Sequence, residues 1–381
     1  QIAFIHDAKT EEKRQRLLDL VREGEIRVLI GSTEKNVWDS LKETDLPIVI
    51  YGMGNGADMI IENLQSIGAD FADIFASDEF VRGHSFHGKR VLKYSEVQEK
   101  YSDFVIVMAF AVHDEKMLAR VKELSQEHTL YFPDVPVVGD GIFSREYIEE
   151  HEEEFDKAYS FLSDEKSKQS YIDILNFKVS GKTEYLFKCE RKKEEIYADY
   201  LCPNDDEILM DLGAYDGDTI REFLNVTDNK YRKIYAVEAD EKNYKKLIDK
   251  TSHLERIETF NIAAWDKKET LFFEKKKGRN SKLSSSGKFE LQADSVDNIL
   301  QGKEITLLKM DIEGSEKKAL EGARKTIQEH RPKLYVCAYH RNSDMFTLPL
   351  KINEIRPDYK IYFAHHPYVP AWESNFYCCI D

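Results

Sequence analysis

The chain contains 381 residues, of which 41% are hydrophobic and 33% charged, a balance that excludes a disordered chain and leaves room for two domains. Its formal net charge of −16 repels phosphate backbones, which argues against nucleic acid as a partner. The longest apolar run, 104–112, is too short for a membrane span, and no basic-then-apolar leader opens the sequence. Together with five cysteines that form neither a C-x-x-C pair nor a His-spaced metal pattern, these features predict a cytoplasmic protein.

The first third of the chain predicts a small α/β unit. Residues 1–45 are expected to be mainly helical around one short apolar stretch. From 46 to 144, apolar runs alternate with helical periodicity, with strands expected at 48–52, 71–78 and 104–110 and helices at 57–68 and 115–124. Such alternation is typical of a doubly wound parallel sheet, so we expect a Rossmann-like domain at 46–144.

A glycine-rich turn joins the first strand and the first helix of this domain. Gly52, Gly54 and Gly56 fit the small-residue pattern of dinucleotide-binding loops, and Asp78 follows the next strand, where a ribose-binding acid would lie. The domain shows no Tyr-x-x-x-Lys proton relay, and residues 71–92 resemble small Rossmann-like domains that precede sugar acetyltransferases. Three roles stay open: binding of a nucleotide or nucleotide-sugar, structural or oligomerising docking, and NAD(P) binding.

The composition changes twice more along the chain. Residues 145–200 are charged and poor in β-branched residues, which predicts a helical connector. From 201 to 381 the alternation returns, with strands expected at 207–213, 233–239, 257–265, 305–311, 333–340, 359–365 and 375–380, and helices at 217–225, 241–250, 294–300 and 315–330. No helical pattern separates the last two strands, so the final strand is expected to run antiparallel. A seven-stranded doubly wound sheet with a reversed terminal strand resembles the class I methyltransferases.

A second glycine-rich turn, "DLGAYDGDT", follows the first strand of this C-terminal region. Asp211 stands at the strand's carboxyl end, where open α/β sheets bind ligands, and Gly213 allows close backbone approach. Asp216 and Asp218 crowd the turn, which disfavours a pyrophosphate and suits a cationic ligand such as S-adenosylmethionine. Glu238, at the end of the next strand, is placed to accept hydrogen bonds from ribose hydroxyls.

Three ionisable residues end a later apolar strand. Period-two alternation puts Lys309, Asp311 and Glu313 on one face, where burial is costly unless they pair or act. The alternative is a structural Lys309–Asp311 ion pair with Glu313 capping the following helix.

The stretches "DLGAYDGDT", "VEAD", "LLKMDIEGSEKKALEGA" and "AYH" occur in an order and at spacings that resemble the FkbM family of S-adenosylmethionine-dependent methyltransferases. The resemblance implies O-methylation, mainly of sugar and natural-product hydroxyls, with Asp311 and Glu313 at the reaction centre. Ala338 departs from the acid that the family often carries two residues before the strand-end His340. The cofactor-binding residues expected from the turn, the resemblance and the strand ends are Asp211, Gly213, Ala214, Tyr215, Asp216, Gly217, Thr219, Glu238, Ala239, Asn261 and Ala263.

Methyl transfer to a hydroxyl needs alignment and removal of a proton. We expect Asp311 or His340 to be the base, Lys309 to orient a carboxylate or steady the developing oxyanion, and Glu313 to complete the catalytic set. The leading prediction includes no resident metal, although Asp311, Glu313 and His340 could ligate Mg²⁺ or Mn²⁺. His365 and His366 are expected at a strand-end surface, and residues 275–288 form either a solvated loop or a basic lid.

The sequence therefore predicts a methyltransferase that acts on a small-molecule or glycan hydroxyl, with S-adenosylmethionine as cofactor and a homo-oligomer as one possible assembly. Two alternatives remain: an NAD(P)-dependent oxidoreductase centred on the first glycine loop, and a nucleotide-sugar-binding scaffold.

Overall fold

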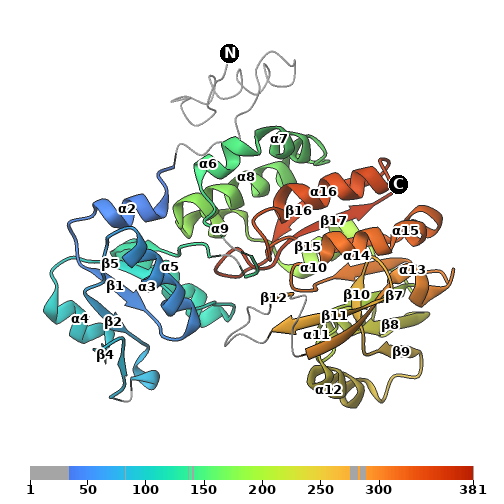
Figure 1. The fold of residues 1–381 in the computed structure, drawn as a ribbon, viewed down its shortest axis with the longest axis horizontal. Helices are drawn as coiled ribbons and strands as arrows, with labels where there is room; N and C mark the ends of the chain where they lie inside the picture. The colour runs from blue at the N-terminus through green and yellow to red at the C-terminus, as the bar shows by residue number, and fades with distance from the viewer. Residues whose placement is uncertain are drawn as a thin grey trace, which may run out of the picture.

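The computed structural model describes residues 34–380 except 82, 136, 140, 275–281 and 284–288. Two sheets, each built mainly of parallel strands, lie on either side of a group of helices (Figure 1). The expected helical character of residues 1–33 lies outside the described residues. So does the basic 275–288 segment, apart from the two-residue strand β12 (Lys282–Leu283). Within the described part of the chain, no helix has the length and apolar character that a membrane span requires.

The N-terminal domain is built on a six-stranded sheet. Its strand order is β3-β4-β2-β1-β5-β6, and every neighbouring pair is parallel except the β3–β4 hairpin. Buried residues of α2 and α3 pack on one face of the sheet, and those of α4 and α5 on the other. The elements are α2 (Val37–Glu43), β1 (Ile48–Tyr51), α3 (Asn55–Ser66), β2 (Asp73–Phe75), β3 (Ser85–Phe86), β4 (Lys89–Leu92), α4 (Tyr94–Lys100), β5 (Val105–Met108), α5 (Glu115–Glu127) and β6 (Thr129–Tyr131).

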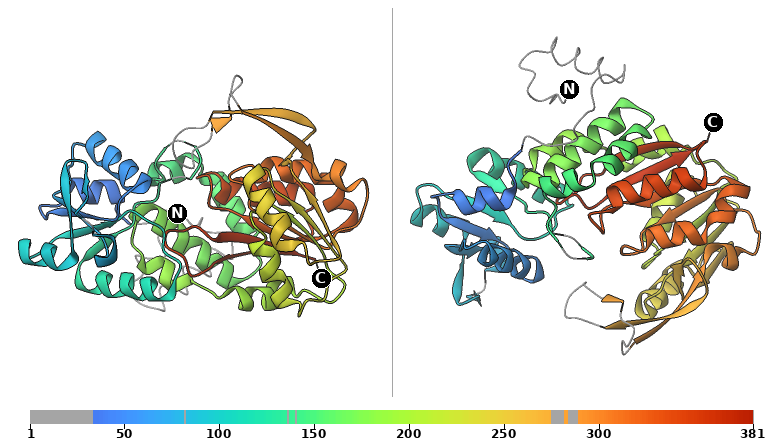
Figure 2. Two further views of the ribbon diagram at one scale, coloured as in Figure 1. Left: turned by 90° about the horizontal axis from the view of Figure 1, so that it is seen from below. Right: turned by 45° about the horizontal axis from the view of Figure 1, so that its top comes forward.

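The helices that follow belong to the core of the C-terminal half. Tyr171 is fully buried, its ring packs edge-on against Phe363, and its hydroxyl donates a 2.8 Å hydrogen bond to the carbonyl of Met345. These helices are α6 (Arg145–Glu150), α7 (Glu152–Ser160), α8 (Glu165–Ser180), α9 (Glu184–Cys189), α10 (Lys193–Ile196) and the π-helical turn η3 (Tyr197–Leu201). Figure 2 shows α6 to α9 between the two sheets.

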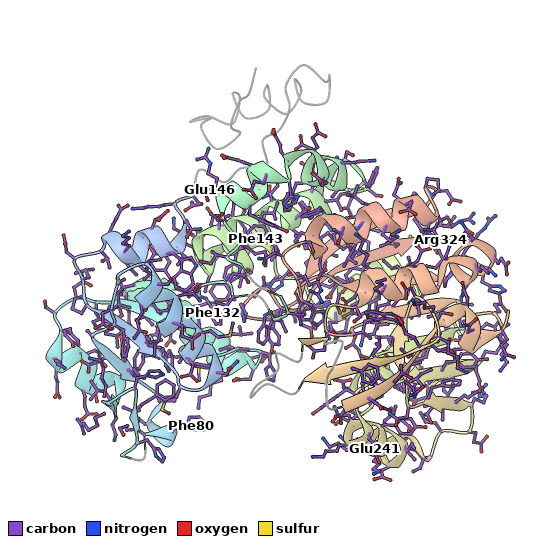
Figure 3. All side chains as sticks on the ribbon, in the orientation of Figure 1. Phe80, Phe132, Phe143, Glu146, Glu241 and Arg324 are labelled. Atoms are coloured by element: carbon purple, nitrogen blue, oxygen red, sulfur yellow. The ribbon has the colours of Figure 1, made fainter. Side chains whose placement is uncertain are left out.

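One continuous apolar core joins the two domains. It runs from Val49 and Phe75 in the first sheet through Phe132 and Phe143 to Phe346 in the C-terminal half. Phe132 and Phe143 lie in the region between the two sheets (Figure 3). Because this core crosses the domain boundary, the N-terminal domain is packed onto the rest of the chain rather than tethered to it.

The C-terminal sheet has seven strands in the order β16-β17-β15-β14-β7-β8-β9. All neighbouring pairs are parallel except those that involve β17, which runs antiparallel to both β15 and β16. The predicted seven-stranded sheet and its reversed last strand are therefore confirmed. The strands are β7 (Ile208–Leu212), β8 (Lys233–Val237), β9 (Ile257–Phe260), β14 (Leu307–Met310), β15 (Lys333–Cys337), β16 (Lys360–His365) and β17 (Ser374–Cys379).

Helices cover both faces of this sheet. Apolar residues of α10, η3, α11 and α12 pack on one face, and those of α13 to α16 on the other. A further four-stranded sheet, of order β10-β13-β11-β12, precedes β14. The remaining elements are α11 (Asp218–Val226), α12 (Glu241–Thr251), β10 (Ala263–Trp265), β11 (Glu269–Glu274), β13 (Phe289–Ser295), α13 (Val296–Leu300), α14 (Glu316–Gly322), α15 (Arg324–His330) and α16 (Asp344–Ile355).

Candidate functional site

The second glycine-rich turn lies at the carboxyl end of β7, in the middle of the sheet. Gly213 has a φ of +83°, and a Cβ there would lie 1.8 Å from the carbonyl oxygen of Asp311. The amides of Gly213 and Ala214 both donate to the carbonyl of Val237, at 2.9 and 3.0 Å. The turn passes directly over the end of β14, and for this reason no side chain fits at Gly213.

Asp211 and Lys309 form a buried ion pair beneath this turn. They are register partners on β7 and β14, and Lys309 Nζ lies 3.3 Å from Asp211 Oδ1 and 3.8 Å from Asp311 Oδ2. Neither oxygen of Asp211 has a hydrogen bond among the described residues. Burial raises the pKa of Asp211 to about 6 against the attraction of Lys309. Burial alone would lower the pKa of Lys309, but the two aspartates raise it above its usual value. The predicted Lys309–Asp311 pair is present, but Asp211 is the nearer of the two partners of Lys309.

Glu238 closes the other side of the turn. Its Oε2 accepts the amide of Tyr215 at 2.8 Å and its Oε1 accepts the amide of Asp240 at 2.7 Å. Glu238 is 8% exposed, and this burial raises its pKa. The carboxylate is therefore fixed beside the turn, at the place expected for a ribose-binding acid.

The other residues expected to contact a cofactor are placed unequally. Asp216 forms ion pairs with Arg221 and Lys250, so its carboxylate already has two cationic partners. The hydrogen bonds and charges of these two residues lower the pKa of Asp216. Asn261 donates to the carbonyls of Glu238 and Ala239, at 2.9 and 3.2 Å, and so faces back toward β8. Tyr215 is 46% exposed, Thr219 lies in the first turn of α11, and Gly217 has a φ of +86°.

Ala263 lies in a different sheet from the one predicted. The sequence predicted one strand over 257–265, but β9 ends at Phe260, and Ala263 begins β10, which pairs with β13. The single strand was a wrong prediction. Asn261 and Ile262 break the ladder, and the second apolar run, 263–265, joins the inserted sheet.

His340 follows the end of β15 and lies among carboxylates. Its Nδ1 is 2.9 Å from Glu316 Oε1, and its Nε2 is 3.4 Å from Asp311 Oδ1 and 3.9 Å from Glu313 Oε2. Burial would lower the pKa of this imidazole, but the surrounding carboxylates, Glu316 foremost, raise it to about 10. His340 is therefore an imidazolium at neutral pH.

Asp311 lies near both Lys309 and His340. Its carboxylate is 30% exposed and accepts the hydroxyl of Tyr339 at 3.0 Å. Burial would raise its pKa, but Lys309 and His340 lower it overall, so Asp311 is ionised at neutral pH. Glu313 has a φ of +52°, and its side chain is 67% exposed at the mouth of the site.

Sequence reasoning missed a second charged group next to Asp311. Lys193 of α10 lies 3.0 Å from Glu222 Oε2 and 3.4 Å from Glu373 Oε2, and its charge contributes to the lowered pKa of Asp311. These three residues come from the connector, from α11 and from the loop between β16 and β17. No short motif links them, because only the fold brings them together. It also missed Glu316, although the helix-start position of Glu316 after Gly314 was visible in the sequence.

The N-terminal domain reaches this site through a crossing segment, residues 132–143, of which 136 and 140 are not described. The amide of Val138 donates to the carbonyl of His340 at 2.9 Å, and Asn342 donates to the carbonyl of Gly141 at 3.4 Å. A buried ion pair of 2.5 Å between Asp134 and Lys178 of α8 anchors the start of the segment. The crossing segment therefore borders the loop that carries His340.

Two glycines of the first glycine-rich turn are packed against the end of β5, and the third is not. A Cβ on Gly52 would lie 2.5 Å from the ring of Phe110, and a Cβ on Gly56 would lie 2.4 Å from the carbonyl oxygen of Ala109. Gly54, with a φ of +100°, has open space. Asp78 is exposed and begins a short 3₁₀ turn three residues after β2 ends. Packing against the end of β5 explains why two of these glycines must be small.

His365 and His366 are not surface residues, so that prediction was wrong. Their exposed fractions are 0% and 3%. His365 bonds to Ser374 and to the carbonyl of Tyr368, each at 3.0 Å, and His366 Nε2 lies 2.7 Å from the hydroxyl of Tyr377. Burial lowers the pKa of both imidazoles, that of His365 to about 4. They are neutral, hydrogen-bonded core residues.

Comparison with known proteins adds three findings. Residues 211–362 match the family model described as the methyltransferase FkbM domain. A solved methyltransferase FkbM from Methylobacillus flagellatus KT is 23% identical, with a TM-score of 0.69 over 97% of this chain and 99% of that chain. No curated protein matches the chain.

More distant structures resemble only about half of the chain. An rRNA methylase from Streptococcus thermophilus is 14% identical, with a TM-score of 0.33 over 49% of this chain and 94% of that chain. A fibrillarin from Aeropyrum pernix, solved with natively bound S-adenosyl-L-methionine, is 12% identical, with a TM-score of 0.31 over 46% and 66%. These two likenesses are too weak to support an argument. By the family model, residues 211–362 of the C-terminal half are similar to the methyltransferase FkbM domain.

Proposed function

We propose that this chain is an S-adenosylmethionine-dependent O-methyltransferase. The observation that carries the proposal is Asp211, a fully buried carboxylate at the carboxyl end of β7 whose ion pair among the described residues is with Lys309, 3.3 Å from Oδ1. Neither oxygen has a well-formed hydrogen bond among those residues, so the place suits a ligand with a further cationic donor. S-adenosylmethionine, which carries an α-ammonium group and a sulfonium, is such a ligand.

The residues present fit this cofactor. Glu238 is held beside the turn by two backbone amides and keeps lone pairs for ribose hydroxyls. Asp211 and the backbone of Gly213 and Ala214 would receive the amino-acid end. Asp216 is better explained as a support for the turn, because Arg221 and Lys250 already bind it. When bound, the cofactor supplies an electrophilic methyl group, and the chain supplies alignment and proton removal.

Asp311 is the better of the two expected bases. His340 already carries a proton at neutral pH, whereas Asp311 is ionised, partly exposed and held by the Tyr339 hydroxyl. In this account Asp311 accepts the proton of the acceptor hydroxyl, and Lys309 and His340 fix its position. General-base catalysis contributes about 10² to 10⁴-fold, so Asp311→Asn should slow turnover far more than it weakens cofactor binding.

We further propose a carbohydrate or glycan-precursor hydroxyl as the acceptor, which rests on the resemblance of the sequence motifs. We also propose a cytoplasmic location, supported by five cysteines that form neither a C-x-x-C pair nor a His-spaced metal pattern. Neither the structure nor the comparisons support an NAD(P)-dependent oxidoreductase or a nucleotide-sugar scaffold.

Titration calorimetry with S-adenosylhomocysteine tests the proposal. We expect saturable one-to-one binding by the wild type and at least tenfold weaker binding by Glu238→Gln. Glu241→Gln is the matched control, because Glu241 lies three residues away on the exposed face of α12 (Figure 3). Among the described residues its ion pair is with Lys245. Absence of wild-type binding, or equal binding by Glu238→Gln and Glu241→Gln, would contradict the proposal.

A further inference from the structure

We propose that the acceptor side of the site binds a first-row divalent cation between His340 Nε2 and the carboxylates of Asp311 and Glu313, with Glu316 orienting the imidazole. The catalytic use of this cation rests on the proposed function, but the existence of the site does not.

The distances fit a common ion. Ligand atoms about 2.1 Å from one cation lie about 3.0 Å apart at right angles and about 4.2 Å apart in line. The Nε2 atom of His340 is 3.4 Å from Asp311 Oδ1 and 3.9 Å from Glu313 Oε2, which falls inside this interval.

Glu316 is better placed as an orienting residue than as a ligand. Its Oε1 lies on the Nδ1 side of His340, at 2.9 Å, and accepts the amides of Ile312 and Gly314 at 3.0 and 3.4 Å. Metal-binding histidines generally direct their second nitrogen to such a carboxylate, which fixes the ring and the tautomer. Glu316 therefore leaves Nε2 to face Asp311 and Glu313.

The contact between His340 and Glu316 is buried. The His340 side chain is 2% exposed, and its Nδ1 faces Glu316 Oε1 at 2.9 Å. Glu316 is fully buried, and its second oxygen, Oε2, has no hydrogen bond among the described residues. Asp344, also buried, adds a further carboxyl beside this pair.

The donor set selects the class of cation. Carboxylate oxygens suit Mg²⁺ and Mn²⁺, while an imidazole favours Mn²⁺ and later first-row ions over Mg²⁺. The ring binds as a neutral base, so the proton that it carries leaves to solvent when the cation enters. Because Asp311 and Glu313 are exposed at the mouth, open coordination positions face the acceptor side.

Such a cation would complete the proposed chemistry. A hydroxyl coordinated to a divalent ion is more acidic, so a weak base suffices to remove its proton. The cation would thus lower the basicity that the catalytic carboxylate needs.

Mn²⁺ is the probe for the test. The full chain is freed of metal with a chelator, and MnCl₂ is titrated in while free Mn²⁺ is followed by electron paramagnetic resonance. We expect one equivalent to bind saturably. Asp311→Asn and His340→Gln should each weaken binding at least tenfold, and Glu316→Gln about 10 to 100-fold. Glu329→Gln, an exposed acid on α15, is the matched charge control and should bind as the wild type does.

Two measurements keep the result decisive. Glu313→Gln, whose side chain is exposed, should also bind Mn²⁺ more weakly and tests the site even if a buried variant misfolds. Binding of S-adenosylhomocysteine by each metal-free variant reports folding and, separately, the proposed function. No saturable Mn²⁺ binding by the wild type, or wild-type affinity in both Asp311→Asn and Glu313→Gln, would overturn the cation site.

Discussion

The two glycine-rich turns of this chain have the same local form and different surroundings. Each follows a buried parallel strand and leads into a helix, and each contains glycines with positive φ. In the first turn, Gly52 and Gly56 are small because Phe110 and the carbonyl of Ala109 lie against them. In the second, Gly213 is small because the backbone of Asp311 passes beneath it.

The difference teaches what a glycine pattern can and cannot establish. Spacing predicts a tight turn, because only glycine tolerates the close contacts and positive φ. Chemistry depends on the neighbours of the turn. The first turn is bordered by an aromatic ring, whereas the second stands over a buried carboxylate, a buried lysine and a third ionised group. We therefore propose that the first turn stabilises the fold and that the second takes part in the reaction.

The largest expected effect comes from weakening the contact that anchors the N-terminal domain to the helices after it. Asp134→Asn leaves Lys178 charged, buried and unpaired, which should lower the free energy of unfolding by about 3–5 kcal/mol. If the domain only supports the site, the folded variant should still bind S-adenosylhomocysteine as the wild type does. Urea unfolding and calorimetry measure the two quantities.

A double variant controls for the charge. Asp134→Leu with Lys178→Met replaces the pair by apolar groups of similar size and should recover most of the lost stability. A loss below about 1 kcal/mol in Asp134→Asn would show that the crossing segment is not anchored by this pair.

Acid should destabilise the C-terminal core, because it contains a buried, neutral histidine. The pKa of buried His365 is about 4, below the value of about 6.5 in an unfolded chain, so the unfolded state binds the proton first. The stability that neutral His365 contributes is present above pH 6.5 and is lost as pH falls toward 4, by about 3 kcal/mol in total. His365→Gln should therefore show a smaller loss of unfolding free energy between pH 7 and pH 5 than the wild type. Equal losses would contradict a buried, neutral His365.

The sequence predicted the regular part of the fold well. Strict alternation of apolar strands and amphipathic helices identified both sheets, and the missing crossover helix identified the reversed β17. It did not reveal α16, because Pro349 interrupts the helical pattern, yet the chain is helical on both sides of it. The predicted helix over 315–330 divides at Ala323 into α14 and α15. Tertiary packing decides such breaks, and no local pattern records it.

The candidate site was predictable only where one strand carries it. Lys309, Asp311 and Glu313 share a strand end, and Asp211 lies on the neighbouring strand in register. Glu316 was invisible as a partner of His340 because the contact joins the start of α14 to the loop after β15. The protonation of His340 follows from that contact, so the expected choice of base could not be settled from the sequence.

Filling the first turn should affect packing alone. A Cβ on Gly56 would overlap the carbonyl of Ala109, so Gly56→Ala should cost about 1–3 kcal/mol of unfolding free energy. Its affinity for S-adenosylhomocysteine should stay within twofold of the wild type. A large loss of affinity would show instead that the first turn takes part in cofactor binding.

A comparison of Gly213→Ala with Gly54→Ala tests whether the second glycine-rich turn, and not the first, takes part in cofactor binding. Both glycines have positive φ, so each variant carries similar backbone strain, but only the Cβ at position 213 meets backbone, at 1.8 Å from the carbonyl oxygen of Asp311. We predict that calorimetry with S-adenosylhomocysteine finds binding weakened at least 100-fold in Gly213→Ala and unchanged in Gly54→Ala. Unchanged affinity in Gly213→Ala, or lost affinity in Gly54→Ala, would contradict the assignment of reaction to the second turn.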